Sequence, residues 1–278
     1  EIAQCLVGSE MCIRDSGMLG LIENQDAIAH NLANVNTAGY KKEALIFKNV
    51  YNSIVSEPQN RADYKYRNHH DVGMLSMGSQ SHKLVHEFLQ GTLSRTDRPL
   101  DVAIQGDGFF KVQGPDGSVA YTRNGNFVIN SQNLLTDNDG NLVMDRENRP
   151  IQLNIRALGI TTPKEITING NGQMCIVRGE GAGTQVLQTI GVWDFSNKED
   201  MKSLGSARYY PKDITTNPEL VAEKYTVEQG AVELSNTNVV NEMINTISTT
   251  RNYETLSKFV KEKSSLMQTA INIGRLKS

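Results

Sequence analysis

Two histidines four residues apart, His82 and His86, have the spacing that comes nearest to a metal site in this sequence. On a helix, side chains four positions apart share a face, and two imidazoles placed in this way can bind zinc. Lys83 stands where the zinc-protease motif requires glutamate, and no third ligand is evident. We therefore interpret the pair as surface or interface histidines, and His69-His70 as a weaker candidate still.

Two glycine-containing loops imitate known binding motifs. Gly106-Asp-Gly108 begins like a dinucleotide fingerprint, but Lys111 stands at the third glycine position and the segment leads into a strand-like pattern. Asp137–Asn141 imitates a calcium loop, but its glycine comes two positions early and the required later glutamate is missing. Hairpin or polar turns explain both segments better than a nucleotide or a calcium ion.

Candidate nucleophiles are equally poor. The sequence contains no G-x-S-x-G motif. Cys5 and Cys12 have a spacing that fits no zinc or redox pattern, and Cys175 lies in a β-type pattern where a small core residue is expected. The odd number and wide scatter of the three cysteines argue against a disulfide framework. We expect no catalytic residue, no bound cofactor and no metal, and we expect that the protein is not an enzyme.

Composition limits the class of partner. The chain has 278 residues, of which 38% are hydrophobic and 21% charged, with a mean hydropathy of -0.41. This length is more than one ordinary core spans, which predicts two or more domains. A net charge of -3 and a pI of about 6.0 give no indication of nucleic-acid binding. No apolar run approaches the ~20 residues of a membrane span, so we expect no direct membrane insertion.

The first sixteen residues differ from the rest of the chain. They have no clear period and resemble translated adapter read-through, so we interpret residues 1–16 as a non-native leader, with a natural flexible tail as the alternative. Ile2 to Val7 is a short apolar run without a basic region before it, so no secretory signal is indicated.

Residues 17–35 have the apolar spacing of an amphipathic helix, with Leu21, Ile28 and Val35 seven apart. Asparagine, threonine and Gly39 follow and end it, because asparagine and glycine adopt the left-handed conformation found at helix C-termini. Residues 41–57 mix helical and extended signals. Residues 58–99 are polar and contain Pro58, and we expect an extended connecting segment with a short element from Lys83 to Ser94.

From Leu100 to about Thr226 the period changes to two, with turn signals such as Asn124-Gly125 between short apolar runs. This pattern predicts an all-β domain. From Asn238 onward the helical period returns for about 38 residues, a rod of roughly 55 Å. A helix of this length needs a partner to cover its apolar face, and the N-terminal helix or copies of the chain are the candidates. We expect a seam on the two helices formed by Leu21, Ile28, Leu32, Val35, Val240, Met243, Ile247, Leu256, Val260 and Met267.

One phrase is more specific than any of these patterns. Asn31-Leu-Ala-Asn-Val-Asn-Thr-Ala-Gly-Tyr-Lys41 closely resembles the signature A-N-N-L-A-N-x-x-T-x-G-[FY]-[KR] of bacterial flagellar basal-body rod and hook proteins. His30 stands where that family usually has asparagine. The residues that carry the motif are Asn31, Leu32, Ala33, Asn34, Thr37, Gly39, Tyr40 and Lys41.

Two further segments resemble the same family in the expected order. Leu100–Phe110 followed by Tyr121–Phe127 is similar to the central part of the rod proteins. Leu234–Val240, then Glu242-Met-Ile244 and Arg251-Asn-Tyr-Glu254, resemble the C-terminal signature. The likeness runs from about residue 17 to residue 276. The length favours a rod protein with one β domain, of the distal or proximal type, and we favour the distal.

The resemblance implies a mainly β fold with long terminal α-helices that pair as a coiled coil around a central all-β domain. Residues 17–57 and 227–278 would form a discontinuous helical assembly domain, 58–99 a connecting segment and 100–226 the β domain. The implied function is a structural subunit of the periplasm-spanning basal-body rod that self-assembles into a helical tube and transmits torque. The implied partners are copies of itself, other rod or hook subunits and the flagellar type III export apparatus. A β-rich adhesin or wall-binding module with helical stalks is the alternative.

Overall fold

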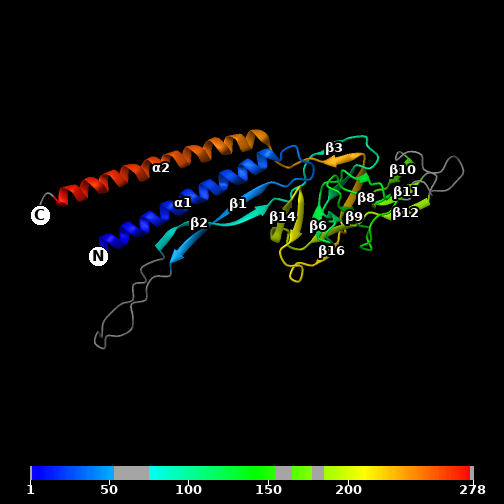
Figure 1. The fold of residues 1–278 in the computed structure, drawn as a ribbon, viewed down its shortest axis with the longest axis horizontal. Coiled ribbons are helices and arrows are strands. Elements are labelled where there is room, and N and C mark those ends of the chain that lie inside the picture. The colour runs from blue at the N-terminus through cyan, green and yellow to red at the C-terminus, as the bar shows by residue number, and fades with distance from the viewer. Residues whose placement is uncertain (1, 53–74, 154–164, 177–184, 276–278) are drawn as a thin grey trace, which may run out of the picture. The chain divides into compact units, whose positions relative to one another are not determined.

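A computed structural model describes residues 2–52, 75–153, 165–176 and 185–275 (Figure 1). The described elements begin with helix α1 (Ile2–Ala33) and strands β1 (Glu43–Asn52) and β2 (Leu75–His86). Sixteen shorter strands follow, and helix α2 (Val239–Arg275) ends the series. The expected class, mainly β with a long helix near each terminus, is therefore confirmed.

The chain divides into two compact units. The first contains Glu1–Ala29, Leu45–Leu84 and Met243–Ser278, and we call it the helical unit. The second contains His30–Ala44 and Val85–Glu242, and we call it the β unit. The β unit thus includes the last residues of α1 and the first residues of α2, so the end of one helix and the start of the other belong to the same folded body.

Both helices have ends that their sequences explain. Asn238 caps α2, because its Oδ1 accepts the backbone N–H of Asn241 at 3.1 Å, and Glu242 stands in the acidic first turn. Helix α1 begins at Ile2, well before Gly17, where the apolar period starts. Residues 2–16 contain no proline, so nothing in their backbone chemistry stops the helix from extending in that direction.

The strands of the β unit are short and mostly antiparallel neighbours. Their bounds are β3 Leu93–Arg95, β4 Val102–Gly106, β5 Phe109–Gln113, β6 Val119–Thr122, β7 Val128–Ile129, β8 Leu135–Thr136, β9 Leu142–Val143, β10 Ile166–Ile168, β11 Gln173–Ile176, β12 Gln185–Thr189, β13 Val192–Phe195, β14 Met201–Gly205, β15 Arg208–Pro211, β16 Glu219–Val221, β17 Tyr225–Gln229 and β18 Ala231–Glu233. A short 3-10 turn, Lys198–Asp200, precedes β14.

The largest sheet has the strand order β14-β15-β6-β5-β9-β8-β7, and β13 joins β5 to β16 beside it. Strands β10, β11 and β12 form a separate sheet. Two pairs bring distant parts of the chain together: β17 pairs with β4, and β18 pairs with β3. Strand β18 directly precedes α2, so its pairing with β3 anchors the segment that leads into that helix.

The central strand β5 is buried on both faces. Phe110 belongs to a cluster with Val102 and Ile104, whereas Phe109 belongs to a second cluster with Trp193 and Tyr209. Adjacent strand residues point to opposite faces, so two neighbouring phenylalanines supply one ring to each cluster. The second cluster is also connected to the N-terminal motif, because the Tyr209 hydroxyl accepts a hydrogen bond from the backbone there.

Two predicted turns have different outcomes. Asp137–Asn141 is a hairpin loop between β8 and β9, as predicted: the Asp137 carboxylate accepts the N–H of Asp139 at 2.9 Å and that of Asn141 at 2.9 Å. The hairpin predicted at Gly106–Gly108 is wrong. Strand β4 pairs with β17 and β5 with β6, so this segment connects two different sheets, and both glycines have positive φ.

The helical geometry considered for His82 and His86 is also wrong, because both lie on strand β2. Residues 41–57, whose signals were mixed, begin with β1, in which Ile46, Phe47, Val50 and Tyr51 are β-favouring types. Of the predicted connecting segment, residues 58–99, residues 58–74 lie outside the described residues, and the rest contributes β2 and β3.

Candidate functional site

Asn31 is the last buried residue of α1, and its side chain binds the chain where it returns as β1. Asn31 Nδ2 donates to the Glu43 carbonyl oxygen at 2.9 Å, and Asn31 Oδ1 accepts the Glu43 N–H at 2.8 Å. The carboxamide thus pairs with a strand residue as a peptide group would. Tyr40 Oη donates to the same Oδ1 at 3.1 Å. An apolar side chain could make none of these bonds, which explains asparagine at this position of the motif.

The turn between helix and strand uses the other polar residues of the motif. Asn34 Nδ2 donates to the His30 carbonyl at 2.9 Å, and Thr37 Oγ1 donates to Asn34 Oδ1 at 3.2 Å. Gly39 has a φ of 71°, and a Cβ added there would lie 2.3 Å from the backbone nitrogen of Asn124. Both the left-handed backbone and the close approach require glycine. The Gly39 N–H donates to the Glu233 carbonyl at 2.8 Å.

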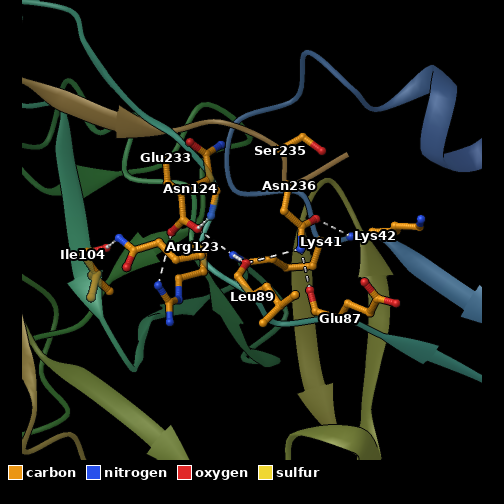
Figure 2. Close-up of polar contacts among 12 residues, drawn as sticks. Lys41, Lys42, Glu87, Leu89, Ile104, Arg123, Asn124, Glu233, Ser235 and Asn236 are labelled. Atoms are coloured by element: carbon orange, nitrogen blue, oxygen red, sulfur yellow. Dashed lines mark hydrogen bonds and ion pairs between the residues drawn. The ribbon is translucent and has the colours of Figure 1, made fainter. Parts of the chain in front are cut away.

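The motif ends in a buried ionic cluster of Lys41, Glu233 and Arg123 (Figure 2). The side chains of Lys41 and Glu233 are both 0% exposed, and Lys41 Nζ lies 2.6 Å from Glu233 Oε1. Arg123 Nη1 lies 3.2 Å from the other oxygen, Oε2. The Gly91 N–H donates to Oε1 at 2.8 Å, and Lys41 Nζ also donates to the Leu89 carbonyl at 2.7 Å. One carboxylate thereby binds three separate segments of the chain.

Burial and charge act in opposite directions on this cluster. Burial lowers the pKa of the Lys41 ammonium, because it removes water from the charged form, and the adjacent Glu233 carboxylate raises it. The Arg123 guanidinium lies 5.2 Å from the centre of the Phe109 ring, a cation–π arrangement that partly replaces water. A buried charge without its partner would cost several kcal/mol, so the three groups depend on one another.

Further bonds hold the backbone next to this cluster. The Lys41 N–H donates to Tyr209 Oη at 2.9 Å, and the Lys42 N–H donates to Asn236 Oδ1 at 2.8 Å. Asn236 Nδ2 then donates to the Glu87 carbonyl at 2.7 Å (Figure 2). Asn236 lies between β18 and α2, so it links the segment before α2 to the segment after α1. Burial raises the pKa of Tyr209, which keeps its hydroxyl protonated.

A second buried carboxylate, Glu43, lies nearby in the β unit. His86 Nδ1 is 4.0 Å from Glu43 Oε1, and the exposed His30 has its Nδ1 3.5 Å from Oε2. Burial lowers the pKa of His86, whereas Glu43 and a hydrogen bond to the Lys41 backbone raise it. The imidazole packs edge-on to Tyr209 at 5.1 Å between ring centres. Lys42 Nζ pairs with Glu242 in the first turn of α2 at 2.8 Å.

We call this set of contacts, from Asn31 to Lys42 and including Arg123, Glu233 and Asn236, the junction. Its polar groups are arranged to bind one another.

The β unit also has an open groove of about 590 Å³ lined by Asp107, Asp194 and residues 220–224. Its two aspartates bind Lys198 Nζ at 2.6 and 3.2 Å. Within the described ranges, no group of three or more histidine, cysteine, aspartate or glutamate side chains could hold a metal ion. Likewise, none of the helices described there is long and apolar enough to cross a membrane.

Comparisons with known proteins agree with the order of motifs along the chain. Family models match as follows: flagella basal body rod protein at residues 16–41, flagellar hook protein FlgE/F/G D1 domain at 103–176, and flagellar basal body rod FlgEFG protein C-terminal at 228–273. The flagellar basal-body rod protein FlgG of Buchnera aphidicola subsp. Schizaphis graminum is 32% identical, over 88% of this chain and 92% of the relative.

The chain belongs to the flagellar basal-body rod protein family. FlgG of Bacillus subtilis is 29% identical over 94% of this chain and 97% of that relative, and FlgF of Mesorhizobium japonicum is 29% identical over 92% and 93%. The protein is thus a structural component of the flagellar basal-body rod, and the relatives are not enzymes. Family membership favours this function over the adhesin or wall-binding alternative.

In this rod protein the motif lies at the end of α1 and in the turn that leads to β1, within the β unit. Asn31, Gly39, Tyr40 and Lys41 are buried, Asn34 and Thr37 are half-buried and make the turn, Leu32 is half-buried, and Ala33 is exposed. The motif residues therefore join the end of α1 to the β unit.

The predicted seam residues do not all lie in one environment. Ile28 is 5% exposed, and Leu21 and Val35 are half-buried. On α2, Val240, Met243 and Ile247 are 63%, 50% and 54% exposed. Leu256 and Val260 are half-buried, and the side chain of Met267 lies outside the described residues. The first part of the predicted α2 stripe is thus more exposed than the second part. The spacing of apolar residues alone did not distinguish the two parts.

Four residues of the site were missed from the sequence: Arg123, Tyr209, Glu233 and Asn236. A signal existed for Glu233, which is the one charged residue in the apolar strand Ala231-Val-Glu233 and stands just before the C-terminal signature. Arg123 lies in a segment that resembles the family. Tyr209 had no signal, because its role depends on pairing between β15 and β6, which the sequence does not reveal.

Proposed function

We propose that this rod protein self-assembles through its terminal helices into a helical tube that transmits torque, with copies of itself and other rod and hook subunits as partners. The observation that carries the proposal is the exposure of large apolar side chains along α2. Met243, Ile244 and Ile247 are 50–58% exposed, and Leu266 is 67% exposed. Such a helix gains its stability by burying apolar surface, so it needs a partner.

The proposal includes pairing of α1 with α2 within one chain. Asn24 Nδ2 donates to Thr249 Oγ1 at 3.3 Å. Ala27 and Ile28 on the same side of α1 are 4% and 5% exposed, and Thr249 is 5% exposed. On α2, residues 242, 246, 249, 253, 256 and 260 alternate in steps of four and three and are buried or half-buried. That spacing is the one that a coiled-coil seam uses.

The bonds beside the buried ionic cluster support the mechanical part of the proposal. The Gly39–Glu233 hydrogen bond and the Lys42–Glu242 ion pair tie the end of α1 and the start of α2 to the β unit. Interlocked bonds in a buried site resist distortion better than one flexible linker, because several must break together. Force that reaches either helix end would be carried into the β unit through these bonds.

Export by the flagellar type III apparatus and a position in the distal part of the rod complete the proposal. Both are inferred from the family signatures, which occur in the expected order along the chain. Each is tested by expressing the chain in a flagellated host that lacks its own FlgG and asking whether the chain reaches isolated basal bodies.

The experiment that tests assembly compares one exposed apolar residue on helix α2 with one on a strand of the β unit. Met243→Asp should prevent rod assembly and motility in that host, because a carboxylate would be placed in an apolar contact. Leu204→Asp is the matched control: Leu204 is also 50% exposed, but it lies on β14. Soft-agar motility and electron microscopy of basal bodies give the readout. Normal motility of Met243→Asp, with stable protein, would contradict the proposal.

A further inference from the structure

Helix α2 carries two apolar strips on opposite faces. The first contains Thr249, Tyr253, Leu256 and Val260, which are buried or half-buried in the single chain. The second contains the exposed side chains Val240, Met243, Ile244 and Ile247. Successive residues of an α-helix are rotated by about 100°, so Ile247 and Thr249, two positions apart, point in nearly opposite directions. The proposed pairing within one chain therefore covers the first strip and leaves the second uncovered.

The uncovered face of α2 becomes basic farther along the helix. Ile244, Arg251 and Lys258 are seven residues apart, so they share one face. Lys261 lies one turn beyond Lys258 on nearly the same side. Arg251, Lys258 and Lys261 are all exposed, and Glu254 and Glu262 only partly offset their charge. This face thus combines an apolar strip with a positive stretch.

The uncovered face of α1 has the opposite charge. Leu19 and Ile22 are 61% and 42% exposed, and Glu23 and Asp26 are exposed beside them. The sequence from residue 17 to residue 33 contains no lysine or arginine. The described side chains of α1 therefore present an apolar strip together with a negative stretch.

We propose that the acidic face of α1 in one copy binds the basic face of α2 in a second copy. The inference rests on the proposed self-assembly and specifies which surfaces meet. Apolar side chains would fill the centre of the contact, and Glu23 and Asp26 would face Arg251 and Lys258 at its edge. Pairing of two α1 faces or of two α2 faces would bring like charges together, so the charges select the mixed pair.

The polarity of growth follows from this pairing. Each copy has one α1 face and one α2 face, and the two differ from each other. A contact between different surfaces of identical subunits leaves one of each surface free at the ends, so it extends into a helical filament when the rotation does not close. A contact between identical faces would stop at a dimer. The charge pattern thus accounts for an open assembly built from one kind of chain.

Charge reversal tests the inference with the full-length chain. Glu23→Lys/Asp26→Lys makes both faces basic, and Arg251→Glu/Lys258→Glu makes both acidic. Each variant alone should need an at least about tenfold higher concentration to assemble, the change that ~1.4 kcal/mol produces. An equimolar mixture should assemble near the wild-type concentration, because every contact in it can then join opposite charges. Sedimentation and electron microscopy at low salt measure the assembled fraction.

Controls separate this inference from general charge effects and from the proposed function. Glu199→Lys/Glu223→Lys makes the same change in net charge as Glu23→Lys/Asp26→Lys, but at exposed sites of the β unit, and should assemble like the wild type. Circular dichroism of each variant should retain the wild-type helical signal. If either α-helical variant assembles alone like the wild type, or if the mixture fails to assemble, the inference is wrong while self-assembly stands. A wild-type chain that stays monomeric would overturn both.

Discussion

Two regions of the molecule differ in how their side chains find partners. They are the polar junction, where the end of α1 and the segment before α2 meet, and the exposed faces of the two helices. At the junction, Lys41 and Glu233 are completely buried and bind each other and the backbone of neighbouring segments. On α2, Ile247 is 54% exposed although it is apolar. A single chain completes the polar junction by itself, whereas in the proposed assembly another chain covers the apolar helix faces. The stability of this rod protein and its assembly should therefore depend on different residues.

The largest loss of stability is expected from Glu233→Gln. The neutral amide would leave Lys41 and Arg123 buried without a countercharge, and loss of one partner from a buried ion pair costs about 3–5 kcal/mol. Urea unfolding followed by tryptophan fluorescence measures this change, since Trp193 is buried in the β unit. The control is Glu228→Gln, whose ion pair with the well-exposed Arg95 should contribute at most about 1 kcal/mol. An equal loss of unfolding free energy in the two variants would show that the buried ion pairs of Glu233 contribute no more than an exposed one.

Gly39→Ala should have the next largest effect. Its positive φ disfavours alanine, and the new methyl group would collide with the Asn124 backbone, so we expect a loss of about 1–3 kcal/mol or more in unfolding free energy. Gly117→Ala is a matched control, because Gly117 also has a positive φ of 81° but has open space around it. The difference between the two variants isolates the close approach from the backbone conformation. A smaller loss at Gly39 than at Gly117 would refute the steric argument.

A smaller, pH-dependent effect is expected at His86. Burial lowers the pKa of His86 below the usual value of about 6.5. At pH values near and below 6.5 the unfolded chain therefore binds more protons than the folded chain. Stability should therefore fall as the pH is lowered below about 6.5. His86→Gln should flatten this dependence in urea titrations from pH 7 to pH 5. A wild-type chain that gains stability on acidification would show that Glu43 outweighs burial.

The smallest effect on stability is expected on the exposed face of α2. Ile247→Ser should change the unfolding free energy of the monomer by no more than about 0.5 kcal/mol, since its side chain is half exposed before assembly. The same variant should lower the assembled fraction in sedimentation. Together these results would place stability at the junction and assembly on the helix face. A large destabilisation of the monomer would mean that Ile247 already has a partner within the chain.

Local patterns predicted much of this architecture because they report local physics. The apolar period and Asn238 located α2 to within a residue of its described start, and alternating residues with turn signals predicted the β region. The same reasoning could not choose between helix and strand at Lys83–His86, a short segment whose strand pairing involves residues far away. It also could not reveal that Gly106–Gly108 joins two sheets, because strand partners are set by the whole chain.

The sequence by itself determined the family, the two helices and the residue types of the motif, since these depend on spacing along one segment. Only the tertiary structure showed why those types are needed. Asn31 pairs with Glu43 across a turn, and Lys41 meets Glu233 from a strand 192 positions later. A buried charge acquires its meaning from its partner, and that partner is brought near by folding. The sequence supplies both residues, but their contact exists only in the folded chain.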